Sequence, residues 1–133
     1  MPTFPFDVAG PEVFVFLGGA AIVGVLLAVG VVIVEAVALT LFKWSRFWRA
    51  LLASFVMNLV STVVGIFVIG LALTVGAPVW LLLTFVASVV LEGGVIYLMD
   101  RPKARQGLLA VLVANVVTYL PLGALAILSG AFN

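Results

Sequence analysis

The sequence contains no cysteine and no histidine, and only 8% of its residues are charged. Without these two residue types the chain has no disulfide, no thiolate or imidazole metal site and no Ser–His triad. The scarcity of charge excludes more, because a soluble domain usually carries about 25% charged residues. A soluble fold is therefore excluded.

Apolar residues make up 66% of the 133 residues, and the mean hydropathy is +1.46. A helix needs about 20 predominantly apolar residues to cross a bilayer, and four stretches of the sequence are long enough. They lie at 12–42, 50–76, 78–99 and 106–131. We therefore predict an all-α integral membrane protein with four transmembrane helices.

The two ends of the first apolar stretch need separate treatment. Residues 1–11 are rich in proline and carry no positive charge, and we expect them to form a strap along the membrane interface. The stretch 12–42 would make a helix of about 46 Å, which exceeds the hydrocarbon thickness of about 30 Å. It either tilts strongly or bends at Gly18-Gly19 with residues 11–17 along the surface, and we favour the bend.

All six basic residues lie in two short segments between the apolar stretches, 43–49 and 101–105. Short loops rich in lysine and arginine remain in the cytoplasm. We therefore predict a multi-pass protein of the cell membrane, with loops 43–49 and 101–105 in the cytoplasm and both termini on the opposite side. The same rule accounts for three basic residues in each loop, so no nucleic-acid partner is expected. Aromatic side chains near the ends of the apolar stretches are expected to anchor the membrane interfaces: Trp44, Trp48, Trp80 and Tyr97.

Rare polar residues recur inside the apolar stretches at a constant spacing of 57 residues. The matching pairs are Glu35 with Glu92, and Asn58 with Asn115. We interpret 12–76 and 77–133 as two tandem copies of a helical hairpin within one membrane domain. Since a two-helix unit restores the direction of the chain, the copies have the same orientation, and a pseudo-two-fold axis is expected along the membrane normal.

Each predicted helix contributes one strongly polar side chain, and all four lie about 12–14 Å below the basic loops. These residues form a predicted polar layer: Glu35, Asn58, Glu92 and Asn115. Hydroxyl side chains at helical spacing are expected to complete its lining: Ser54, Ser61, Ser88 and Thr118. Small and hydroxylated neighbours favour close contact between helices in lipid, so the layer is expected to face the interior.

Carboxylates inside a membrane are costly and often mark ion or substrate paths. The layer therefore favours a transporter or channel component for protons, small cations or amines, in which Glu35 and Glu92 exchange protons or bind the cation. The alternative is a non-catalytic accessory or scaffold subunit of a larger membrane complex, where the layer acts as hydrogen-bond glue between helices.

Besides the lipid bilayer, the expected partners are further copies of the chain or a larger membrane protein. Glu35 and Glu92 belong to no motif with a nucleophile, and no glycine-rich phosphate loop is present. We expect no enzyme activity, no cofactor and no metal.

Overall fold

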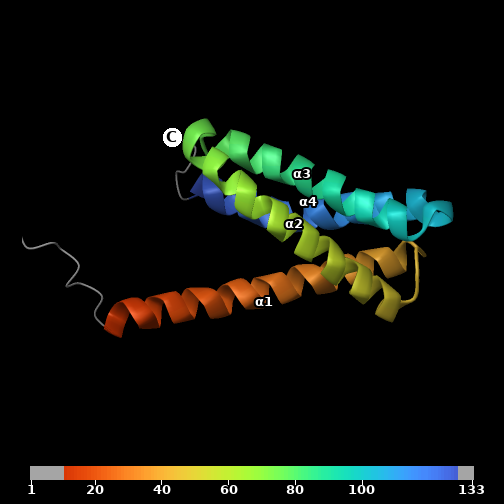
Figure 1. Ribbon diagram of the computed structural model, residues 1–133, viewed down its shortest axis with the longest axis horizontal. Coiled ribbons are helices and arrows are strands. Elements are labelled where there is room, and N and C mark those ends of the chain that lie inside the picture. The colour runs from red at the N-terminus through yellow and green to blue at the C-terminus, as the bar shows by residue number, and fades with distance from the viewer. Residues whose placement is uncertain (1–10, 129–133) are drawn as a thin grey trace, which may run out of the picture. The chain divides into compact units, whose positions relative to one another are not determined.

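The computed structural model describes the backbone of residues 11–128 and the side chains of 18–67, 76, 78–125, 127 and 128. Within this part the elements are α1 (Pro11–Leu41), α2 (Phe47–Val75), α3 (Ala77–Met99), the short 3-10 helix η1 (Arg101–Lys103) and α4 (Ala104–Leu128) (Figure 1). Contacts divide the chain into two compact units, Met1–Gly30 and Val31–Asn133. The second unit contains the end of α1 and all of the other helices.

Four helices of the described chain are long and apolar enough to cross a membrane, which confirms the predicted all-helical class. They are consistent with a multi-pass membrane protein. The strap predicted over 1–11 lies outside the described residues, except that Pro11 begins α1. The helix α1 continues without interruption through Gly18 and Gly19. One long helix therefore replaces the expected bend, because two glycines weaken a helix by only about 1 kcal/mol each and do not remove its backbone hydrogen bonds.

Lys43 ends α1 in a conformation that is unusual for a residue with a side chain. Its φ angle is 59°. The Trp44 amide donates to the Leu39 carbonyl at 2.9 Å, and the Lys43 amide donates to the Thr40 carbonyl at 3.0 Å. These two bonds are the pair that defines a Schellman ending. The turn directs Trp44 back towards Leu39, and both side chains are buried in the same apolar core.

The turn between α2 and α3 consists of Gly76 alone. Its φ of 75° and ψ of 158° lie in a region that only glycine adopts readily. The Trp80 amide donates to the Gly76 carbonyl at 3.0 Å, which closes the first turn of α3. Pro78 follows at a position in that turn where a missing amide hydrogen costs nothing. The chain therefore reverses within one residue.

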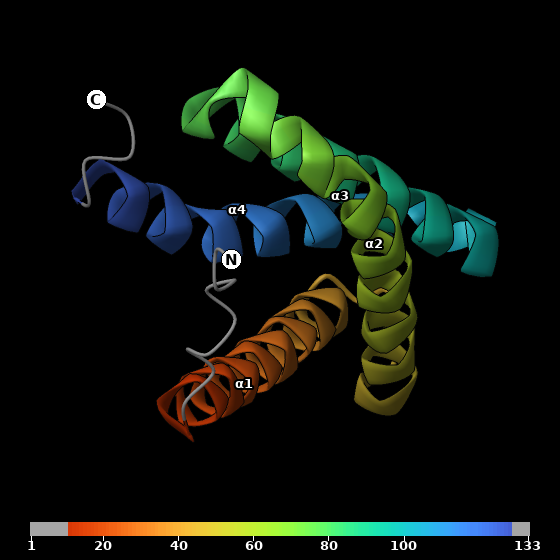
Figure 2. The ribbon, with the colours of Figure 1, turned by 60° about the vertical axis from the view of Figure 1, so that its left-hand side comes forward.

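In the second unit α3 lies beside both α2 and α4 (Figures 1 and 2). The two basic loops meet at one end of this unit through Arg49. Its Nη2 atom lies 3.4 Å from the Asp100 carboxylate, and the guanidinium group stacks over the Trp44 ring at 5.4 Å from its centroid. Loops that are far apart in the sequence are thus joined by one side chain.

The apolar core lies near these loops and is built from small residues around Trp44. Trp44 was expected at the membrane interface, but it is fully buried, whereas Trp48 is 77% exposed. A Cβ atom added to Gly107 would lie 2.9 Å from Trp44 Cδ1 and would also collide with Ile96. The absence of a side chain at Gly107 therefore allows the tryptophan to pack against α4.

The Lys43→Gly variant should be more stable by about 1 kcal/mol, because glycine adopts a positive φ without steric strain. Lys43→Ala is the matched control, since it removes the charge but keeps the Cβ atom. Unfolding of both variants in detergent micelles with increasing dodecyl sulfate measures the difference. Equal stability of the glycine and alanine variants would contradict the backbone explanation.

The Gly107→Ala variant should lose about 1–3 kcal/mol of unfolding free energy, because the added methyl group overpacks the contact with Trp44 and Ile96. Gly94→Ala is the control, since a Cβ at Gly94 meets nothing within 4 Å. In that variant the better helix propensity of alanine should leave stability unchanged or slightly higher. The same micelle titration applies, and a stable Gly107→Ala protein would exclude the tight packing described.

Candidate functional site

Glu35 of α1 is buried, with 2% of its surface exposed, and contacts two polar side chains of α2. The Asn58 amide donates to Glu35 Oε2 at 2.5 Å. The Asn58 amide also donates its second hydrogen to the Ser54 carbonyl, one turn earlier on α2, at 3.0 Å. Both hydrogens of the amide are therefore used, and the orientation of Asn58 towards Glu35 is fixed.

Ser54 is fully buried and lies between Glu35 and the backbone of α1. Its Oγ atom is 2.5 Å from Glu35 Oε2 and 2.9 Å from the Val32 carbonyl oxygen. A hydroxyl group has one proton, so it donates to only one of these two acceptors at a time. The predicted lining residue Ser54 thus contacts the carboxyl group directly.

Glu92 and Asn115 form the second couple, between α3 and α4. Each is 3% exposed. Asn115 Nδ2 donates to Glu92 Oε2 at 2.6 Å, and its other hydrogen is directed to the Val111 carbonyl at 3.0 Å. The position that corresponds to Ser54 holds Val111, so no hydroxyl group supports Glu92 from that position.

Ser61 of α2 lies beside the Glu92 carboxyl group, so the second couple also has a neighbour from α2. Its hydroxyl oxygen lies 3.0 Å from the Met57 carbonyl oxygen and 3.3 Å from that of Asn58. The structure therefore places all four predicted members of the polar layer in the second unit, as two glutamate–asparagine couples.

Thr118 bonds to its own helix, as Ser61 does. Its hydroxyl group lies 3.1 Å from both the Ala114 and Asn115 carbonyl oxygens. It supports the backbone next to Asn115 and makes no hydrogen bond to a carboxyl group in the described chain. Ser88 differs again, because its Oγ atom lies 3.2 Å from the Tyr119 hydroxyl group.

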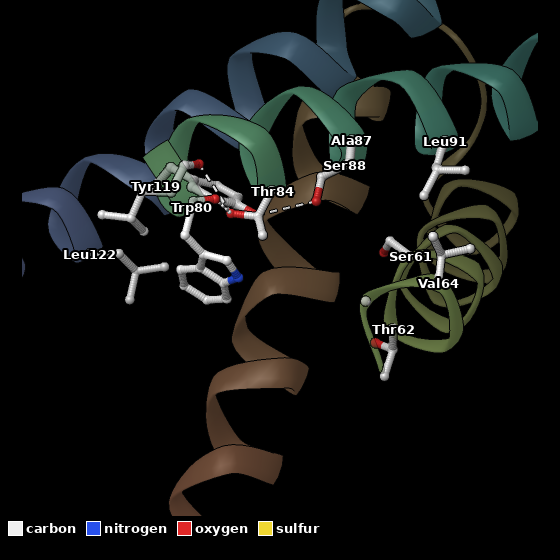
Figure 3. Close-up of a pocket in the computed structure, with 12 residues that line it drawn as sticks. Ser61, Thr62, Val64, Trp80, Thr84, Ala87, Ser88, Leu91, Tyr119 and Leu122 are labelled. Carbon is white, nitrogen blue, oxygen red and sulfur yellow. Dashed lines mark hydrogen bonds between the residues drawn. The ribbon is translucent and has the colours of Figure 1, made fainter. Parts of the chain in front are cut away.

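A cavity of about 280 Å³ lies between α2, α3 and α4 (Figure 3). Along the helices its lining residues lie farther from the basic loops than the couples do. Its polar lining consists of Ser61, Thr62, Thr84, Ser88, Tyr119 and Trp80. The Trp80 indole nitrogen is buried and has no hydrogen-bond partner among the described residues. The remaining lining is apolar, so a few polar groups are set in an otherwise hydrophobic wall.

Tyr119 and the inward position of Trp80 were missed by the sequence interpretation. Tyr119 lies four residues after Asn115, which places it on nearly the same face of α4, and that spacing was the available signal. Its ring also packs edge-on against Phe85, with centroids 5.4 Å apart. Trp80 was assigned to the membrane interface because it lies near a helix end. That position is common both for interface tryptophans and for tryptophans that face the interior.

Comparison of the chain with protein-family models, with curated proteins and with solved structures found no match. The chemistry of the site is therefore inferred from its own residues. Among the described side chains, no group of three or more histidine, cysteine, aspartate or glutamate residues lies together as a metal site would require.

Asn115→Leu should destabilise the protein more than Asn58→Leu. The first change removes the one amide that bonds to Glu92, whereas Glu35 keeps Ser54 as a partner. Hydrogen bonds between helices in membrane proteins contribute about 0.6 kcal/mol on average and up to about 1.7 kcal/mol. We expect a loss near the upper value for Asn115→Leu and near the mean for Asn58→Leu, measured by dodecyl sulfate titration. The reverse order would show that Ser54 does not support Glu35.

Proposed function

We propose that the chain is a multi-pass membrane protein that carries protons or small cations, amines included, through a bilayer, with Glu35 and Glu92 as the exchanging groups. The observation that carries the proposal is the burial of two carboxyl groups, each bonded to an asparagine of the next helix at 2.5–2.6 Å. A buried carboxyl group in an apolar bundle is costly to retain. Two buried carboxyl groups in one chain favour a role beyond the packing of helices.

The contacts of Ser54 support proton exchange at Glu35. When the hydroxyl donates to Glu35, the carboxyl group accepts hydrogen bonds from both Ser54 and Asn58 at Oε2, as a carboxylate does. When the hydroxyl donates to the Val32 carbonyl instead, the short contact with Glu35 is kept if the carboxyl group supplies a proton. One set of neighbours therefore accommodates both protonation states, which is what a proton-exchanging site requires.

We further propose that residues 12–76 and 77–133 are two copies of one hairpin, related by a pseudo-two-fold axis along the membrane normal. The supporting observation is that equivalent contacts occur 57 residues apart. Both asparagines bond to a glutamate 23 residues earlier and to the carbonyl four residues earlier. Buried positions also correspond at this spacing: Ala36 with Gly93, Leu39 with Ile96, and Ala53 with Ala110.

The orientation that we propose places both basic loops in the cytoplasm and both termini on the opposite side. The link from Arg49 to Asp100 supports a common side for the two loops. The excess of lysine and arginine there favours the cytoplasm. A bundle of four helices leaves little room for water, so we propose that a continuous path forms in a homo-oligomer.

The second candidate is a non-catalytic accessory or scaffold subunit of a larger membrane complex. The observation in its favour is that each couple is well hydrogen-bonded between neighbouring helices, as an element that fixes helix register would be. A stoichiometric larger partner that copurifies from native membranes would favour this role.

Glu35→Gln and Glu92→Gln should each reduce proton or cation flux in proteoliposomes by about tenfold or more, because glutamine keeps the shape and hydrogen bonds of glutamate but exchanges no proton. Asp100→Asn makes the same chemical change outside the layer and should retain flux. Thermal stability of each variant is measured in parallel. If stable variants transport as well as the unmodified chain, or if that chain gives no flux above empty liposomes, the transport proposal fails.

A further inference from the structure

The cavity leads towards one of the two couples. On α3 its lining runs from Trp80 to Leu91, about three helical turns. Polar side chains recur along this stretch every four residues, at Trp80, Thr84 and Ser88, and the next step is Glu92. Residues four apart lie on nearly the same helical face. Each step of four residues turns the row by about 40° around α3, so Ser88, one turn before Glu92, is the lining member of the row nearest to that carboxyl group.

Ser61 links the cavity to Glu92 from the opposite helix. It lines the cavity and lies beside the Glu92 carboxyl group. The residues that bond to Glu35 differ in this respect, because neither Ser54 nor Asn58 belongs to the lining. The two couples are thus unequal: Ser88 and Leu91, within one helical turn of Glu92, line the cavity, whereas no described residue of α1 near Glu35 does.

The chemistry of the wall favours an organic cation over a bare metal ion. Small-molecule sites are lined mostly by apolar and aromatic groups with a few placed polar atoms, and have volumes from about 300 Å³ upwards. The cavity, at about 280 Å³, lies near this lower bound and combines the Trp80 and Tyr119 rings with hydroxyl groups. Aromatic faces attract ammonium groups, and hydroxyl oxygens accept hydrogen bonds from them.

The Trp80 indole group sets a requirement on the part of a bound ligand that lies farthest from Glu92. Its indole N–H is buried without an acceptor in the described chain, and the nitrogen is directed into the space between α3 and α2 (Figure 3). Indole nitrogen donates and never accepts. A ligand that satisfies it carries an oxygen acceptor at the end away from its ammonium group.

We propose that this cavity binds a small amphiphilic amine, with its ammonium group at the Ser61 and Ser88 hydroxyl groups within one helical turn of Glu92, its apolar body between Trp80 and Tyr119, and an oxygen acceptor at the Trp80 N–H. The proposal rests on the proposed function for the role of Glu92 as a cation-binding group. It goes beyond the proposed function because it states which carboxyl group the ligand approaches first: Glu92, before Glu35. Binding is measurable without any transport assay.

Tyramine is a suitable probe, because it has an ammonium group, one aromatic ring and a hydroxyl group at the far end. Its uncharged analogue tyrosol has the same ring and hydroxyl group without the ammonium group. Titration calorimetry on the full chain in detergent should show tyramine binding and tyrosol binding about tenfold more weakly or not at all. Equal binding of the two compounds would overturn the assignment of a cation site.

Variants identify the groups that bind the probe. Glu92→Gln should weaken tyramine binding by about tenfold or more, and Trp80→Phe by roughly threefold to tenfold, through loss of the N–H donor and of part of the aromatic surface. Val90→Ala is the control on the same helix, since Val90 is 65% exposed and lies outside the cavity lining. Unchanged affinity in both Glu92→Gln and Trp80→Phe contradicts the proposed pose.

Access to the cavity is tested independently of binding affinity. Because the chain has no cysteine, the reaction of one introduced thiol can be measured without background from other thiols. Ser88→Cys should react with a charged methanethiosulfonate reagent, and tyramine should slow the reaction. Ser54→Cys, at a fully buried position beside Glu35, should react far more slowly. Equal rates at the two positions overturn the cavity as the route to Glu92.

The two proposals fail in different ways. If tyramine binding depends on Glu92 but Glu35→Gln and Glu92→Gln leave flux unchanged, the binding site stands and the transport role fails. If flux depends on both glutamates but tyramine neither binds nor protects Ser88→Cys, the amine site fails and the transport role stands. If Glu92→Gln does not fold, the amine site is still tested by the comparison of tyramine with tyrosol and by the Trp80→Phe variant.

Discussion

The hydrogen bond between a glutamate of one helix and an asparagine of the next is the interaction on which the rest of the second unit depends. In lipid, apolar side chains provide little driving force between helices, because the acyl chains are equally apolar. Packing of small residues and a few polar contacts must therefore set the register. Each asparagine uses one amide hydrogen for its own helix and the other for the glutamate, so the couple fixes rotation and height together.

The couples also explain why the core lies where it does. Fully buried residues such as Ala36, Ala53 and Ala110 lie within a few residues of the couples or between them and the basic loops. These alanines allow the helices to approach closely enough for short carboxyl–amide contacts, and Gly107 allows Trp44 to fill the space at the loop end. Arg49 then joins the two loops over the Trp44 ring. Away from the loops the helices enclose a cavity instead of a packed core.

The sequence predicts the helices well, because in so apolar a chain the charged segments and Gly76-Ala77-Pro78 are clear separators. The layer residues were accessible for a similar reason: Glu35, Asn58, Glu92 and Asn115 stand out against valine and leucine. Their pairing across neighbouring helices needed coordinates. Trp44 was misplaced because a tryptophan beside lysine and arginine is typical of the membrane interface, and its burial depends on a turn at Lys43 and a glycine on α4.

The difference between the two couples is not apparent from the constant spacing of the polar residues. A constant spacing of 57 residues suggests two equal halves, yet the substitution of Val111 for a hydroxyl group at the position of Ser54 makes them unequal. Glu35 has a serine that accommodates both of its protonation states, and its partners lie outside the cavity. Glu92 has no such serine on α4, and the row of polar residues on α3 leads to it. If residues 12–76 and 77–133 are copies of one hairpin, that single position leaves Glu35 with both a hydroxyl and an amide partner and Glu92 without the hydroxyl, so two equivalent carboxyl groups are held by different chemistry.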